Sequence, residues 1–205
     1  MSQFQPKTSP ILEALSDAAL AVCATTPWSE VSLIALCKEA KINLADCADA
    51  AVQKATIAAY LDQGLDRHML KNASELMLDH KVADGLFDCF MARFDGMEIQ
   101  RSAWVSILKA DALDPAASFA RATRRARTSA WALEALGVDT TMMWAWFGVL
   151  DLARRLKKME TLWLDDGPDL SKTMAGLDQS LKESERWASH VAGLGAYFKR
   201  QHLNR

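Results

Sequence analysis

The stretch SLIALCKEAKINLADCADAA, residues 32–51, has the residue pattern of a helix-turn-helix. Ser32 stands where it can cap a short helix whose apolar Leu33 and Leu36 point inward. Residues 40–43 form the predicted turn, and Asn43 with Asp46 three residues later resembles an N-cap pair that begins the next helix. The stretch therefore predicts two short helices joined by a tight turn.

The second of these helices lacks the side chains that a DNA reader needs. Arginine, lysine, asparagine, glutamine and aromatic residues are the ones that meet phosphates and base edges. No basic residue occurs between Lys41 and Lys54, whereas Asp46 and Asp49 would face a phosphate backbone. Because binding strengthens with the number of phosphates neutralised, we expect a degenerate DNA-binding surface at Lys41, Asn43, Asp46 and Asp49.

The composition is ordinary for a folded protein and shows no bias toward nucleic acid. The net charge of the 205 residues is −2, and residues 1–70, with five basic and eight acidic side chains, carry −3. The cysteines lack metal-ligand spacing, the first residues lack a signal sequence, and no apolar run approaches the ~18 residues of a membrane span. We expect a cytoplasmic protein, either free or peripheral to the inner membrane, with reduced thiols.

Helical patterns run through the whole chain, and strand patterns are nearly absent. After a leader over residues 1–9, the apolar spacing predicts an all-α fold of about nine helices. Besides the two in residues 32–51, the expected helices begin at Pro10, cover about 55–70, 74–94 with Ser74 as cap, and 99–110, begin at Pro115, and cover about 141–163 and 170–198. We expect a three-helix head over residues 10–52 and a ligand-binding and dimerisation domain over residues 53–205.

The head resembles the TetR family of regulators. Residues 32–43 align without a gap on that family's T-V-x-x-I-A-x-x-A-G-V-S segment, with Leu36 on the isoleucine and Lys41 on the turn glycine. The family's next segment, typically T-L-Y-x-x-F, is replaced by residues 46–51, which contain no aromatic side chain. The resemblance implies a TetR-like fold and, as one functional hypothesis, a ligand-responsive transcriptional regulator.

Residues 75–180 resemble an offshoot of that fold, the ubiquinone-biosynthesis accessory proteins (the coenzyme Q nine family). The typical W-Y-T-K-R…W-L-x-D-x-S-P-D-F pattern is matched in step by Trp144, residues 163–165 and residues 168–170. This resemblance implies a non-enzymatic homodimer that binds a lipid or isoprenoid. It also implies that the protein presents this ligand to a ubiquinone-pathway enzyme, with a membrane surface as a further possible partner.

Seven tryptophans and nine methionines favour an apolar ligand pocket in the larger domain. Aromatic and flexible methionine side chains suit a cavity for a lipid, and the alternative is that they fill a helical core. Trp131 lies about 120° from the apolar stripe of its helix, which is predicted at Phe119, Ala122, Ala126, Ala130 and Leu133. The predicted pocket residues are Phe87, Met91, Trp104, Phe119, Trp131, Met143, Trp144 and Trp163.

Two basic runs are candidates for a phosphate site or for contact with an acidic partner. The first comprises Arg121, Arg124, Arg125 and Arg127, and the second Arg154, Arg155, Lys157 and Lys158. A solvated helix face is the commoner explanation, with Glu134, Asp151 and Glu160 available for pairing.

The last expected helix carries a narrow apolar stripe at Trp187, Val191, Leu194 and Phe198. We expect this stripe to form a two-fold dimer interface, and the alternative is a helix that lies on a membrane surface. The four histidines are scattered, and no phosphate loop or metalloprotease motif occurs. We therefore expect no enzyme, no catalytic residue, no metal and no cofactor.

Overall fold

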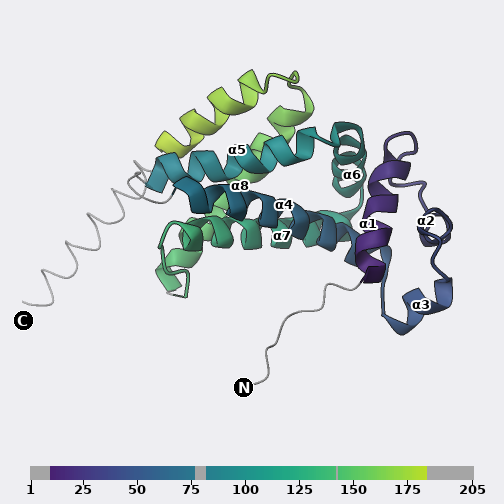
Figure 1. The fold of residues 1–205 in the computed structure, drawn as a ribbon. Helices are drawn as coiled ribbons and strands as arrows, with labels where there is room; N and C mark the ends of the chain where they lie inside the picture. The colour runs from purple at the N-terminus through teal and green to yellow at the C-terminus, as the bar shows by residue number, and fades with distance from the viewer. Residues whose placement is uncertain (1–9, 77–81, 142, 184–205) are drawn as a thin grey trace, which may run out of the picture. The chain divides into compact units, whose positions relative to one another are not determined.

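The computed structural model describes residues 10–76, 82–141 and 143–183 (Figure 1). In these ranges every regular element is a helix, which confirms the predicted all-α fold of about nine helices. The helices are α1 (Pro10–Cys23), α2 (Leu33–Ala40), α3 (Leu44–Asp49), α4 (Lys54–Leu76), α5 (Val82–Glu98), α6 (Arg101–Leu113), α7 (Pro115–Ala135), α8 (Met143–Leu164) and a last one over residues 171–183. None of the described helices is long and apolar enough to cross a membrane.

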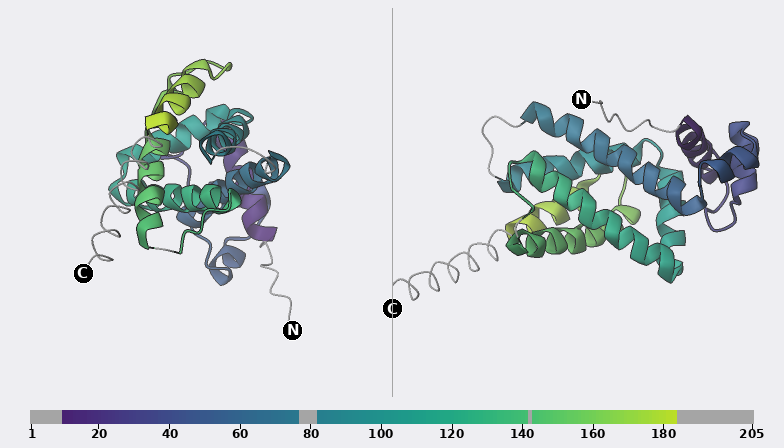
Figure 2. Two further views of the ribbon diagram at one scale, coloured as in Figure 1. Left: turned by 90° about the vertical axis from the view of Figure 1, so that its left-hand side faces the viewer. Right: turned by 90° about the horizontal axis from the view of Figure 1, so that it is seen from below.

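The chain divides into two compact units, each built from segments that are distant in sequence. The first unit comprises residues 1–68 and 95–124, and the second comprises residues 69–94 and 125–205. Helices α4, α5 and α7 each contribute residues to both units. Figure 2 shows the helices in two further views, coloured by residue number. The predicted boundary at residue 52 lies inside the first unit, and a separate three-helix head stays a prediction.

Local side-chain caps begin both short helices of the head, as predicted. The Ser32 hydroxyl oxygen accepts a hydrogen bond from the Ala35 N–H at 3.2 Å, and the Asn43 side chain accepts one from the Ala45 N–H at 3.0 Å. Lys41, at the end of α2, has a φ of 56°. Since this left-handed conformation costs a non-glycine residue about 1–2 kcal/mol, Lys41 holds the turn that glycine makes in the TetR-type pattern at an energetic cost.

The first unit buries apolar side chains from both its sequence segments. Helix α1 packs against α2 and α6, and Leu15, Leu36 and Ile107 are fully buried. Outside the helices, the Trp28 N–H donates a hydrogen bond to the Ser106 hydroxyl oxygen at 2.7 Å. The loop that follows α1 is thus attached to α6, which extends the head's packing beyond residue 52.

A buried ionic cluster joins three helices of the first unit. Asp62 on α4 and Asp111 on α6 each contact both Arg121 and Arg124 on α7. An Asp62 carboxylate oxygen lies 3.4 Å from a guanidinium nitrogen of Arg121, and the other lies 2.6 Å from one of Arg124. An Asp111 carboxylate oxygen lies 2.6 Å from a guanidinium nitrogen of Arg121 and 3.0 Å from one of Arg124. No side chain of the four is more than 9% exposed. Two positive and two negative charges therefore neutralise one another away from water, where an unmatched charge is strongly destabilising.

This cluster reverses the predicted orientation of α7 in the first unit. Phe119, predicted on the apolar stripe, is 77% exposed, whereas Arg121 and Arg124 are buried. The predicted stripe is therefore wrong at Phe119 and Ala122, which are exposed, whereas Leu133 at its other end is buried. The solvated-face interpretation of Arg121 and Arg124 is also wrong. The physical reason is that Asp111 on the preceding helix and Asp62, 62 residues before Arg124, supply carboxylates to this face of α7.

The second unit has large buried side chains on α5, α8 and the helix over residues 171–183. Phe90, Trp163 and Leu177 are each at most 1% exposed. A Cβ atom on Gly176 would lie 2.6 Å from Leu162 Cδ1, so the missing side chain allows the last described helix to approach α8 closely.

Helix α4 continues further than the sequence pattern predicted. Ser74, expected to cap a new helix, lies inside α4, which ends at Leu76, and α5 begins at Val82. The sequence from Leu65 to Leu76 contains neither glycine nor proline, so nothing in it interrupts the helix.

Replacing Asp111 with alanine should remove one of the carboxylates that contact the two buried guanidinium groups of Arg121 and Arg124. We expect this change to lower the free energy of unfolding by about 3–5 kcal/mol, measured by urea denaturation. The matched control is Asp114→Ala, which removes an exposed cap that accepts hydrogen bonds from Ala116 and Ala117, with an expected loss of about 1 kcal/mol. Equal losses in the two variants would contradict a stabilising role for the cluster.

Candidate functional site

Asp166 stabilises the first turn of the helix over residues 171–183, which lines two pockets of the second unit. The Asp166 carboxylate accepts hydrogen bonds from the Thr173 N–H at 2.7 Å, the Thr173 hydroxyl at 2.8 Å and the Gly167 N–H at 2.8 Å. Burial alone would raise the pKa of Asp166, but the hydrogen bonds from Thr173, Gly167 and Lys172 outweigh it and lower that pKa. Asp166, in the turn before this helix, thus caps the helix.

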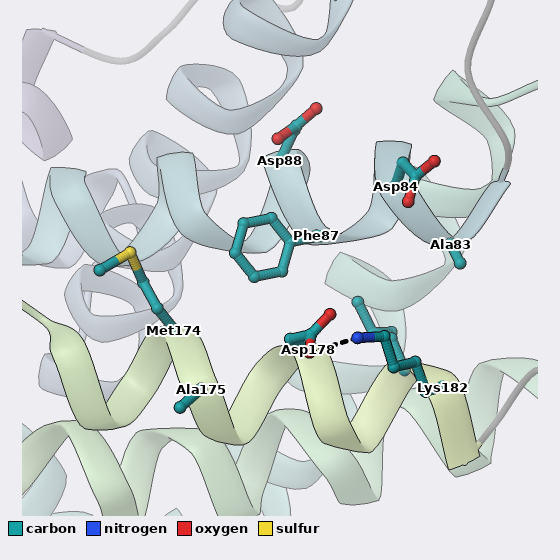
Figure 3. Close-up of a pocket in the computed structure, with 9 residues that line it drawn as sticks. Ala83, Asp84, Phe87, Asp88, Met174, Ala175, Asp178 and Lys182 are labelled. Atoms are coloured by element: carbon teal, nitrogen blue, oxygen red, sulfur yellow. Dashed lines mark hydrogen bonds and ion pairs between the residues drawn. The ribbon is translucent and has the colours of Figure 1, made fainter.

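A groove of about 640 Å³ lies between α5 and this helix. Figure 3 shows Phe87 of α5 projecting toward the side chains of the facing helix. The lining of this α5 groove comprises Ala83, Asp84, Phe87, Asp88, Met174, Ala175, Asp178, Leu181 and Lys182. The groove lies entirely within the second unit.

The α5 groove combines apolar contact surface with an excess of negative charge. Phe87, Met174, Ala175 and Leu181 are its apolar residues. Its lining contains three aspartates and one lysine, Lys182. The Lys182 ammonium lies 2.7 Å from a carboxylate oxygen of Asp178. The groove is therefore suited to the apolar part of a neutral molecule, while its carboxylates disfavour an anionic group.

Of the six predicted pocket residues whose side chains the structure describes, Phe87 is the one that lines the α5 groove. Met91, one turn further along α5, is partly buried. Trp104 and Trp163 are buried among the apolar residues of different units. Phe119 is exposed and Trp131 is 48% exposed.

The side chains of Met143 and Trp144 lie outside what the structure describes. The other wall of the groove was not predicted, because residues 170–198 were expected to form a dimer interface or to lie on a membrane surface. A signal was present: Met174, Asp178 and Leu181 recur at i, i+4 and i+7 and so share one helix face.

The basic runs have separate roles in the structure. Arg125 on α7 pairs with Glu160 at 2.7 Å, and Arg155 on α8 pairs with Asp151 at 2.6 Å, so both acidic residues act as the predicted partners. Glu134 instead accepts a hydrogen bond from the Thr140 N–H at 2.9 Å. The second run lines a pocket of about 300 Å³ with Arg154, Arg155, Lys157, Lys158, Thr161, Ser180 and Glu183, which we call the basic pocket.

A third opening, of about 420 Å³, lies in the first unit beside Trp28 and the ionic cluster. Lys54 donates a hydrogen bond to the Trp28 carbonyl, and its ammonium lies 4.3 Å from the centre of the Trp28 ring. Burial lowers the pKa of Lys54. These contacts use Lys54 to hold the loop that follows α1, so we assign this opening a structural role.

The surface of α3 agrees with the expectation of a degenerate DNA-binding head. Asp46 and Asp49 are exposed, and the Asn43 side chain is engaged in capping α3. Cys47 is the buried residue of α3, and its sulfur lies 3.4 Å from that of Cys37 on α2. Burial raises the pKa of the Cys47 thiol to about 11, so this thiol is a packing group rather than a reactive one.

The predicted dimer stripe at Trp187, Val191, Leu194 and Phe198 lies outside the described residues. Helix α8, the other expected dimer segment, exposes Trp146, Phe147 and Leu150. Because large apolar groups that cluster at the surface commonly mark contact sites, α8 is compatible with the expected homodimer. The dimer stays a prediction.

Within residues 10–76, 82–141 and 143–183, no cluster of histidine, cysteine and carboxylate side chains could hold a metal ion. No protein-family model matches the chain, and no curated protein matches it. The resemblance to TetR-type and ubiquinone-accessory proteins therefore stays a prediction from the sequence.

The Asp166 hydrogen bonds predict a pH-dependent stability. In the folded protein the pKa of Asp166 lies below its ordinary value of 3.8. The ionised carboxylate therefore adds to the free energy of unfolding above about pH 4, and this contribution is lost as the pH falls through the lowered pKa. Asp166→Ala should lower the free energy of unfolding by about 1.5–3 kcal/mol near neutral pH. In urea denaturation, the difference from the unmodified protein should narrow in acid.

The matched control is Asp165→Ala, since the Asp165 residue is exposed. A difference for Asp166→Ala that stays constant between neutral pH and about pH 3 would contradict the linkage between this carboxyl group and folding.

Proposed function

We propose that this protein is a non-enzymatic binding protein for a neutral lipid or isoprenoid, with a TetR-like fold and a head that does not bind DNA. The observation that carries the proposal is the α5 groove of about 640 Å³, lined by Phe87, Met174 and Leu181. Its volume lies within the usual range of small-molecule sites, ~300–1,000 Å³.

The charges of the α5 groove narrow the class of ligand. Asp84 and Asp88 on one wall and Asp178 on the other would repel a fatty-acid carboxylate or a phosphate. A neutral isoprenoid meets no such repulsion. Each Å² of apolar surface that it buries contributes roughly 25 cal/mol to the free energy of binding, from which the entropic cost of ordering the ligand and the protein is subtracted. Isoprenoid alcohols and quinones with isoprenoid tails belong to this neutral class.

The resemblance to the ubiquinone-biosynthesis accessory proteins extends the proposal to a cellular role. The protein would hold an isoprenoid-tailed intermediate and present it to a modifying enzyme. The alternative is a ligand-responsive regulator of the TetR type, which shares the fold and the pocket but requires a head that binds DNA. The exposed acidic surface of α3 disfavours this alternative.

The neutral isoprenoid alcohol farnesol should bind the purified protein and raise its melting temperature, whereas palmitate should bind more weakly. Ala175→Trp places a large side chain in the α5 groove and should weaken farnesol binding by about tenfold or more. Calorimetry measures both effects. The matched control is Ala122→Trp, the same change at an exposed position of α7. Equal farnesol affinity in the two variants, or no binding at all, would sink the assignment of the groove.

The head should bind duplex DNA no better than an acidic control protein at physiological salt. Changing both Asp46 and Asp49 to lysine should raise the nonspecific affinity and make it salt-dependent, because the variant neutralises phosphates that the natural surface repels. A mobility-shift assay with the gene's own promoter region measures this binding. Tight, sequence-dependent binding by the unmodified protein would favour the regulator.

A further inference from the structure

The basic pocket lies between α8 and the end of the helix over residues 171–183. Four cationic side chains of α8 line it, Arg154, Arg155, Lys157 and Lys158, and the lining includes one carboxylate, that of Glu183. The α5 groove also uses the helix over residues 171–183, but through different residues and with the opposite charge. The basic pocket is therefore a separate site with its own chemistry.

Arg155 forms the rigid wall of this pocket. Its Nε lies 2.6 Å from an Asp151 carboxylate oxygen, and its Nη1 donates hydrogen bonds to the Ser180 carbonyl at 2.6 Å and the Ser180 hydroxyl at 3.1 Å. A Glu183 carboxylate oxygen lies 3.7 Å from Arg155 Nη1, and the Arg155 side chain is 11% exposed. These contacts hold the two helices at a fixed separation, so the pocket is preformed.

The other cations of the pocket are available to a ligand. Lys157 and Lys158 are exposed, and in the described chain no carboxylate lies within ion-pair distance of either ammonium group. Arg154 is 75% exposed and contacts Asp151 at 3.2 Å. The arginines of α7 are different: Arg121 and Arg124 are buried against carboxylates, and Arg125, 11% exposed, is paired with Glu160.

We propose that the basic pocket binds a phosphate or diphosphate group. Lys157, Lys158 and Arg154 offer several N–H donors around a space of about 300 Å³, which matches a group with several acceptor oxygens and more than one negative charge. A single carboxylate would leave most of this positive charge without a partner. The phosphate belongs either to a soluble compound or to a phospholipid headgroup, and the two sources share this chemistry.

The first arm of the test measures binding of inorganic pyrophosphate by calorimetry at low salt. The second measures flotation with phosphatidylcholine vesicles, either pure or containing phosphatidic acid. Lys157→Glu with Lys158→Glu should weaken binding by about tenfold or more, since both ammonium groups reverse their charge. The matched control, Lys38→Glu with Lys109→Glu, makes the same charge change at two exposed positions of the first unit and should retain full binding.

Pyrophosphate binding that the pocket variant loses and the control keeps supports the site with a soluble compound as its ligand. The same pattern with phosphatidic-acid vesicles supports it with a phospholipid headgroup. Binding that is equal in the two variants overturns the proposal, and so does failure to bind either probe at low salt. Lys157→Gln with Lys158→Gln, which avoids charge reversal, should show a smaller loss in the same direction if the reversed variant unfolds.

Discussion

The pairing of Asp62 and Asp111 with Arg121 and Arg124 is the constraint on which the first unit depends. Charged side chains from α4, α6 and α7 share one buried site, and the loss of any of them would remove a partner from an opposite charge that lies away from water. The cluster fixes which face of α7 points inward, and it therefore places Phe119 in solvent. Because charged pairs require a specific geometry, this packing specifies the helix arrangement more strictly than apolar contacts alone.

In the second unit, the corresponding role belongs to the attachment of one short helix. Asp166 holds the first turn of the helix over residues 171–183, Gly176 allows its close approach to α8, and Arg155 bonds to Ser180 near its end. One part of this helix then contributes to an acidic, partly apolar groove and another to a basic pocket. Two sites of opposite charge on one element suit ligand groups of different chemistry, a neutral apolar body and a phosphate.

Helices α2 and α3 form the frame of a helix-turn-helix, and α3 exposes Asp46 and Asp49. Ser32 and Asn43 cap the two helices, and Cys37 and Cys47 pack between them. These residues stabilise the motif through capping and buried contacts, which do not restrict the residue types on its outer surface. Asp46 and Asp49 then occupy positions where a DNA reader needs basic or amide groups. The frame is therefore consistent with a structural role in the first unit, where α1 packs on α6.

The sequence by itself determined the helical fold class, the caps of α2 and α3 and the acidic character of α3, because each depends on residues within a few positions of one another. It also singled out Phe87, which lines the α5 groove, and indicated Asp151 and Glu160 as ion-pair partners. Only the tertiary structure decided that Arg121 and Arg124 are buried and that Trp104 and Trp163 fill cores. The reason is sequence distance: Asp62 lies 62 residues from Arg124, and no local pattern shows which carboxylate will reach which guanidinium once the helices pack.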